Sequence, residues 1–225
     1  MFAKEHNFCG YAPFFYGERK GGCQMSGHFV VTINRQFGSL GRPIAMKAAE
    51  LLGINFYDRD IVEEAAKRMN LPVSIISDEE EKVSSPFYEM KFPLGVGNTT
   101  RHDDIYYEQR KIITNIADRE NCIIVGRCAD YTLQDHDNIL KIYIYAPYEA
   151  RMRNCVDILK MKPDAAKKMI SDVDKARASY HKHYAGYLPG DYDHMDFTIN
   201  SASLGVEHSA EVIRDIVLKK FGDMM

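Results

Sequence analysis

The sequence has few cysteines, no long apolar run and no excess of basic residues. No apolar stretch approaches the roughly 20 residues that a membrane-spanning helix requires, so we expect no membrane partner. The net charge is −3 at pH 7, whereas non-specific nucleic-acid binding needs a basic face, so we expect no nucleic-acid partner either. A local basic pocket for a phosphate group is still compatible with this overall charge.

The five cysteines form no CxxC or CxxxC cluster with partner histidines. A chain of 225 residues buries a large core and needs neither disulfides nor a metal to fold. The first 25 residues contain no apolar segment of the kind that signal peptides have. We therefore expect buried, reduced thiols in a cytoplasmic protein, and no metal site built from cysteine.

Residues 1–25 form an N-terminal extension that we expect to stand apart from a single domain over residues 26–225. Met25 directly precedes the first strand-like segment, and codons for Lys20-Gly21-Gly22 can match a bacterial ribosome-binding sequence shortly before it. One interpretation is that translation starts at Met25 and that residues 1–24 are absent from the native protein. The other is a genuine disordered arm. Mass spectrometry of the native protein separates the two.

Strand-like and helix-like segments alternate along the domain. The strands are short runs rich in β-branched residues, at residues 28–34, 122–125, 139–145 and 197–199. The helices have apolar residues at helical spacing, at residues 44–52, 61–69, 103–119, 164–184 and 206–221, and Pro147 opens one more. This alternation predicts an α/β protein whose parallel sheet is covered by helices on both faces. Residues 84–100 are rich in Pro, Gly, Ser and Thr, and we interpret them as a mobile insertion.

A glycine-containing turn over residues 38–41 joins the first strand to the first helix. Such a turn places backbone N–H groups and a helix N-terminus around an anion. The turn does not match the phosphate-binding pattern GxxxxGK[ST], in which the lysine reaches the β- and γ-phosphates and the hydroxyl holds magnesium. Taken alone, the turn therefore predicts an anion site without identifying the anion.

Three arginines, Arg35, Arg42 and Arg127, lie at or just past the ends of strands. Ligands of open α/β sheets bind beyond these carboxyl ends, where a buried guanidinium is costly unless it meets an anion. Three such arginines in one region favour an anion site. The alternative is a set of fixed ion pairs with the nearby aspartates Asp58, Asp60 or Asp130.

Four segments together resemble the cytidylate kinase-like proteins, a bacterial branch of the nucleoside-monophosphate kinases. The segments are residues 33–44 (INRQFGSLGRPI), 56–58 (FYD), 125–130 (VGRCAD) and 174–177 (DKAR), the last followed by Tyr180 and Tyr184. The resemblance extends from about Gly27 to the C-terminus. It implies a three-layer P-loop kinase fold, in which a parallel sheet of about five strands is flanked by helices and carries a helical lid and an insertion.

The resemblance also implies roles for individual residues and a requirement for ATP with Mg²⁺. The residues implied to bind the donor phosphates are Arg35, Gly38, Ser39, Leu40, Gly41 and Arg42. Those implied to bind the acceptor nucleotide are Asp58, Arg127 and Asp130, and those in the lid are Arg153, Asp174 and Arg177. The residues implied to act in catalysis are Arg42, Arg151 and Arg177. No protein ligand for the metal is implied.

The loop departs from the family pattern at several positions. Compared with a true cytidylate kinase, the lysine position holds Gly41 and the Ser/Thr position holds Pro43. Cytidylate kinase-like proteins commonly have Gly-Ser-Gly-Gly-Arg here, so the missing lysine is a trait of that branch, whereas Leu40 in place of a glycine and Pro43 are particular to this chain. Arg42 is a candidate to replace the lysine charge, and in the lid Ile170 and Ala176 stand where relatives often have basic residues. The leading hypothesis is ATP-dependent phosphoryl transfer to a nucleoside monophosphate, with CMP first. The alternatives are a nucleotide- or phosphate-binding regulatory protein without turnover, and a kinase for a non-nucleotide small molecule.

Overall fold

The structure is a computed structural model that describes residues 27–58, 60–68 and 99–225. The N-terminal extension expected over residues 1–25 lies outside these ranges, as does all but the end of the insertion expected over residues 84–100. No helix of the described ranges is long and apolar enough to cross a membrane.

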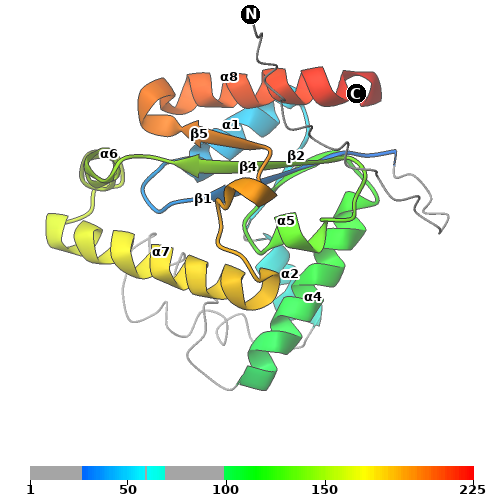
Figure 1. The fold of residues 1–225 in the computed structure, drawn as a ribbon, viewed down its shortest axis with the longest axis horizontal. Helices are drawn as coiled ribbons and strands as arrows, with labels where there is room; N and C mark the ends of the chain where they lie inside the picture. Colours follow the sequence, from blue (N-terminus) through cyan, green and yellow to red (C-terminus); the bar gives the residue numbers. More distant parts are fainter. Residues whose placement is uncertain (1–26, 59, 69–98) are drawn as a thin grey trace, which may run out of the picture.

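Five parallel strands form one sheet in the order β2-β3-β1-β4-β5 (Figure 1). Their bounds are β1 Val30–Arg35, β2 Asn55–Tyr57, β3 Cys122–Val125, β4 Ile139–Tyr145 and β5 Phe197–Asn200. The central strand β1 pairs Ile33 with Val125 of β3 and Arg35 with Ile144 of β4. The carboxyl ends of the three middle strands therefore meet at one edge of the sheet.

Helices cover both faces of the sheet because successive strand residues point to opposite sides. One face packs on α1 (Gly41–Leu52) and α8 (Ser201–Phe221), at the top of Figure 1, through a core that includes Ile33 and Ile213. The other face packs on α2 (Asp60–Arg68), α4 (Thr99–Ala117) and α5 (Ala129–Thr132) around Ile113 and Ile124. Both cores are apolar, so the polar residues of the chain concentrate at the edges and surface.

A third, smaller core lies beyond the carboxyl ends of the strands. It joins Phe37, which follows β1, to Cys155 and Val173. The elements involved are α6 (Tyr148–Arg153), a π-helical turn (Asn154–Ile158) and α7 (Pro163–Ala185), the long helix across the lower half of Figure 1. The expected lid is therefore anchored to the segment that follows the central strand.

The sequence located most of these elements. Strands β3 and β4 have the expected bounds, and Gly53 ends α1 in the left-handed conformation, with φ 65°. The three-residue strand β2 and the four-residue helix α5 were not expected, because both are too short to show a periodic pattern. The last helix was expected from Val206, and a break at Gly205 (φ 71°) separates that part from the first turn of α8.

Candidate functional site

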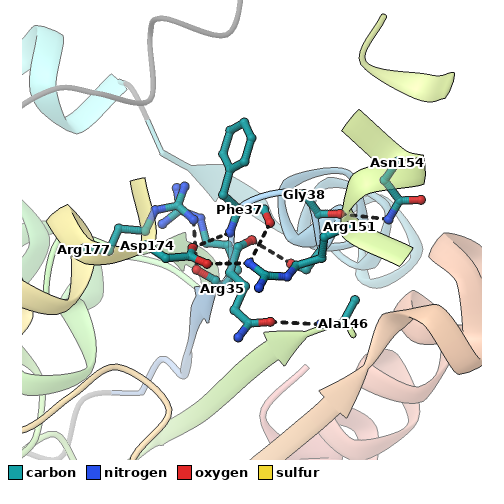
Figure 2. Close-up of polar contacts among 10 residues, drawn as sticks. Arg35, Phe37, Gly38, Ala146, Arg151, Asn154, Asp174 and Arg177 are labelled. Atoms are coloured by element: carbon teal, nitrogen blue, oxygen red, sulfur yellow. Dashed lines mark hydrogen bonds and ion pairs between the residues drawn. The ribbon is translucent and has the colours of Figure 1, made fainter. Parts of the chain in front are cut away.

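The loop between β1 and α1 has its carbonyl groups tied to the rest of the protein. Five successive carbonyl oxygens, from Arg35 to Ser39, each accept a hydrogen bond, and Figure 2 shows several of them. Arg177 Nη1 donates to the Arg35 carbonyl (2.9 Å), Ser39 Oγ to the Gln36 carbonyl (2.9 Å) and Arg151 Nη1 to the Phe37 carbonyl (3.3 Å). Asn154 Nδ2 donates to the Gly38 carbonyl (2.8 Å) and Ser201 Oγ to the Ser39 carbonyl (2.7 Å). The carbonyls of the loop backbone therefore need no ligand.

Several N–H groups of the same loop, in contrast, have no acceptor among the described residues. Within residues 27–58, 60–68 and 99–225, no acceptor lies on the N–H groups of Gly38 and Leu40, or on those of Gly41 and Arg42 in the first turn of α1. The first N–H groups of any helix lack an intrahelical acceptor and carry partial positive charge. Available donors with satisfied carbonyls are the arrangement that suits an anion.

Three arginines surround the buried carboxylate of Asp58, which follows β2. Arg35 Nη2, at the end of β1, lies 3.6 Å from Asp58 Oδ1, and Arg42 Nε, in the first turn of α1, lies 3.2 Å from Asp58 Oδ2. Arg127 Nη2, just after β3, lies 3.9 Å from Asp58 Oδ1. The three strand-end arginines of the sequence therefore meet at one carboxylate beside the N-terminus of α1.

Backbone strain accompanies the placement of Arg127. Gly126, Arg127 and Cys128 are successive left-handed residues, with φ angles of 73°, 58° and 51°. Only glycine adopts this conformation freely, and each other residue costs about 1–2 kcal/mol. Such outliers cluster at functional sites because the surrounding structure must hold them in place. The turn thus points to a functional reason for directing Arg127 to the sheet edge.

Helices α6 and α7 clamp the loop through Phe37. The Phe37 N–H group donates to Asp174 Oδ1 at 2.8 Å, while Arg151 Nη1 donates both to Asp174 Oδ2 and to the Phe37 carbonyl (Figure 2). Asp174 and Arg151 therefore hold both polar groups of one residue of the loop. The expected lid helix is in direct contact with the expected phosphate loop.

Among the residues that the structure describes, this edge carries an excess of positive charge. Five arginines, Arg35, Arg42, Arg127, Arg151 and Arg177, meet two carboxylates, Asp58 and Asp174, so positive charges outnumber negative charges in this cluster. Burial lowers the pKa of Arg177 to about 9, and the nearby charge of Arg35 acts in the same direction. A charge held at this cost is stabilised by an anion that joins the cluster.

Two charged residues of the expected site are not among those that cluster around Asp58 and Asp174 in the described ranges of the chain. Arg153 is exposed at the end of α6. The Asp130 carboxylate is buried and accepts hydrogen bonds from His181 Nε2 (2.9 Å) and the Tyr187 hydroxyl (2.9 Å), which join α5 to the end of α7. Its acceptor-binding role stays a prediction of the resemblance, and its contacts are those of a structural link.

Both ring nitrogens of His181 face hydrogen-bond acceptors. Its Nε2 atom faces Asp130, and its Nδ1 atom faces the Tyr187 carbonyl at 3.0 Å. Burial alone would lower the pKa of His181, but the hydrogen bond and charge of Asp130 and the Tyr187 carbonyl together raise it. Because the folded-state pKa exceeds the unfolded value of 6.5, this stabilisation is complete below pH 6.5 and is lost as the pH rises through the folded-state pKa.

We expect the free energy of unfolding to decline as the pH rises above about 6.5 in the wild type, by about 1.4 kcal/mol for each unit of pKa elevation. Urea unfolding across this range measures the decline. His181→Gln should lose the slope, whereas His183→Gln, an exposed position two residues on, should keep it. A wild-type slope that persists in His181→Gln would show that another group titrates.

Two contributors to the loop were not expected from the sequence. Ser201 directly follows β5, so the rule that ligands gather beyond strand ends could have drawn attention to it. Asn154 lies in the π-helical turn, and nothing in the sequence signals such a turn. Both act on loop carbonyls, so they shape the site from outside.

A metal site is not evident among the protein side chains. In the part of the chain that the structure describes, no group of three or more His, Cys, Asp or Glu side chains could hold an ion. The two carboxylates of the site, Asp58 and Asp174, are both engaged by arginines, and the buried Ser39 hydroxyl donates to the Gln36 carbonyl. These side chains do not fit a protein-built Mg²⁺ site, which needs oxygen ligands free of cations.

Comparison with known proteins gives a family match and proteins of similar fold. The model of the cytidylate kinase-like family matches residues 30–203. An uncharacterized protein from Eubacterium ventriosum ATCC 27560 has a similar structure, with a TM-score of 0.64 and 23% identity over 84% of this chain and 98% of that one. A comparison with curated proteins gives no match.

Two kinases share the fold at lower identity. A shikimate kinase from Bacteroides thetaiotaomicron has a TM-score of 0.51 and 13% identity over 84% of this chain and 98% of that one. A gluconokinase from Sinorhizobium meliloti 1021 has a TM-score of 0.51 and 10% identity over 89% and 98%. The expected three-layer P-loop kinase fold with five parallel strands is thereby confirmed. Because the family model spans well over half of its length, the chain belongs to the cytidylate kinase-like family.

Proposed function

We propose that this protein transfers the γ-phosphoryl group of ATP to a nucleoside monophosphate, with CMP as the first candidate. The observation that carries the proposal is the loop between β1 and α1. Its carbonyls are tied to protein donors, whereas four N–H groups are available beside an arginine cluster with excess positive charge. This combination suits a polyphosphate, and membership of the cytidylate kinase-like family supports a nucleotide.

In the proposed reaction an oxygen of the acceptor's phosphate forms a bond to the γ-phosphorus, and the bond from that phosphorus to the β–γ bridging oxygen breaks. The products are ADP and a nucleoside diphosphate. Such transfer depends mainly on positioning and on neutralising charge at the transferring group, with little covalent chemistry from the protein. An arginine cluster at a helix N-terminus meets this requirement.

Each part of the site takes a role in this proposal. The backbone of residues 38–41, together with Arg35 and Arg42, holds the donor phosphates. Arg127 and Asp58, which pair with each other at 3.9 Å, bind the acceptor. Arg151 and Arg177 neutralise the transferring group from the lid side, and Asp174 positions Arg151.

Mg²⁺, which the family implies, is not assigned a protein ligand. ATP usually carries Mg²⁺ on its phosphate oxygens, and the ion keeps several water ligands. We therefore route no step through the metal, and the need for it is tested by omission from the assay.

The test is a coupled assay that follows ADP release from ATP with a panel of acceptors: CMP, dCMP, UMP, AMP, GMP, shikimate and gluconate. Release that depends on CMP or a closely related monophosphate supports the proposal. ADP release only with shikimate or gluconate would contradict a nucleotide as the acceptor but would still support kinase activity. ATP binding without release for any acceptor would favour a nucleotide-sensing protein.

The sensing alternative has specific support in Leu40 and Pro43. Leu40 adopts the left-handed conformation (φ 58°) at the N-cap of α1, which is costly for leucine, and Pro43 removes one N–H donor and the family's hydroxyl from the first turn. Both changes weaken a phosphate loop relative to the usual pattern.

We predict that Leu40→Gly with Pro43→Thr raises phosphoryl transfer about tenfold or more, since one such electrostatic contact is typically worth about 10²–10³ in rate. Leu40→Gly alone separates the relief of strain from the return of the hydroxyl. The coupled assay measures both variants. No gain in the double variant would show that neither residue limits turnover.

A further inference from the structure

The phosphate loop contains an exchange of two residue types. In the pattern GxxxxGK[ST] the lysine lies six residues after the first glycine. With Gly41 at the lysine position, Arg35 stands at the position of the first glycine. The glycine and the cationic residue of the pattern have thus exchanged places in this chain.

The structure gives a steric reason for the exchange. A Cβ atom built on Gly41 would lie 2.7 Å from Arg35 Cβ and 3.0 Å from Arg35 Cγ, closer than side chains can approach. Only one of the two positions can therefore carry a side chain. A Cβ atom on Gly126 would likewise overlap Arg35 Nη1. Two glycines from separate segments thus frame the Arg35 side chain, one at its base and one at its guanidinium.

The guanidinium of Arg35 ends beside the N-terminus of α1. Arg35 Nη2 and Arg42 Nε approach the two oxygens of Asp58, at 3.6 Å and 3.2 Å, and Arg42 belongs to the first turn of α1. The Arg35 side chain is 12% exposed and that of Arg42 is 37% exposed. Arg35 Nε is buried and has no hydrogen-bond acceptor in the described ranges of the chain. A buried guanidinium donor of this kind is costly until an anion binds it.

We propose that Arg35 supplies the positive charge that lysine supplies in the ordinary phosphate loop, and that residue 41 is a glycine because Arg35 occupies its side-chain space. The inference rests on the proposed function for the identity of the anion, a polyphosphate. Sequence comparison suggested Arg42 as the replacement for the lysine charge. The present inference assigns that role to Arg35, at the end of β1. Arg42 then acts as a secondary, solvent-facing contact.

The binding test uses ADP and inorganic pyrophosphate as probes in calorimetric titrations. Arg35→Met keeps the aliphatic stem and removes the charge, and it should weaken both ligands by about 100-fold or more while retaining the wild-type circular dichroism spectrum. Arg42→Met should weaken them by less than about tenfold. Arg35→Gly with Gly41→Lys restores the ordinary order of the pattern and should recover affinity to within about tenfold of wild type.

Equal losses in Arg35→Met and Arg42→Met would overturn the assignment. So would a double variant that folds but binds no better than Arg35→Met.

The steric half of the inference has a test that needs no ligand. Gly41→Ala should lower the urea midpoint in the wild type and leave it nearly unchanged in an Arg35→Gly background. An equal decrease in both backgrounds would overturn the inference even if ADP binds. If the wild type bound neither ADP nor pyrophosphate, both the proposed function and the role of Arg35 in binding would be wrong. The urea midpoints would still test whether Arg35 and a side chain at residue 41 exclude each other.

Discussion

Replacing Arg127 with methionine is expected to reduce phosphoryl transfer by about two to three orders of magnitude, a larger change in free energy than its effect on unfolding. The loss corresponds to about 2.7–4 kcal/mol, the usual cost of removing one charged contact to a transition state. Stability is spared because Asp58 keeps Arg35 and Arg42 as partners. Removing Arg127 also relieves its repulsion of Arg35 and removes one buried charge.

The coupled assay and urea unfolding measure the two effects on the same protein. Arg214→Met serves as the control, because Arg214 lies on α8 and pairs with its neighbour Asp215, away from the sheet edge. That variant should change neither quantity. A large loss of stability in Arg127→Met, with activity kept, would mean that the arginines form fixed ion pairs, the alternative that the sequence left open.

The second large effect is expected at Gly38, where alanine should lower the free energy of unfolding by about 2–5 kcal/mol. Gly38 has a φ of 77°, which costs an alanine about 1–2 kcal/mol. A Cβ atom there would also lie 3.0 Å from both the Arg151 carbonyl oxygen and Cys155 Sγ. Crowding of this kind adds about 1–3 kcal/mol, because α6 and the π-helical turn would have to move.

Gly53→Ala is the matched control for Gly38→Ala. Gly53 has a similar φ of 65°, and a Cβ atom added there would meet no atom of the described residues within 4 Å. It should therefore lose only the conformational part, about 1–2 kcal/mol. Urea unfolding of the two variants gives the packing contribution as the difference. Equal losses would show that α6 does not press on the loop as the structure indicates.

The sheet was largely predictable because its strands are local patterns. Runs such as residues 122–125 and 139–145 are apolar, β-branched and bounded by turn residues, so each could be recognised on its own. Because the carboxyl ends of parallel strands meet at one edge of the sheet, we expected Arg35, Arg42 and Arg127 to lie near one another. The structure places all three around Asp58. Their roles in binding and catalysis stay predictions.

The parts that could not be predicted depend on contacts between distant residues. The link between Asp130 and His181 joins α5 to α7, and neither residue carries a local signal of the other. Residues two apart lie on different faces of a helix, so the sequence separates His181 from His183, and the structure has His181 buried and His183 exposed.

The left-handed turn at Gly126–Cys128 was also outside the reach of sequence reasoning. A glycine there suggests a turn, but the next two residues, Arg127 and Cys128, ordinarily avoid positive φ angles. Leu40 is similar: the sequence marked it as an unusual residue in a phosphate loop, and only the structure shows that it is left-handed. In both cases tertiary contacts override local preference, which is why these positions carry functional information.

The central claim is that the loop between β1 and α1, with its arginine cluster, binds the phosphates of a nucleotide. Calorimetric titration of the purified protein with ATP and ADP, with and without Mg²⁺, tests this most directly. The account predicts saturable binding of both nucleotides that is weakened about 100-fold or more in Arg35→Met. If neither ATP nor ADP bound, with or without Mg²⁺, the claim that this loop binds nucleotide phosphates would be contradicted.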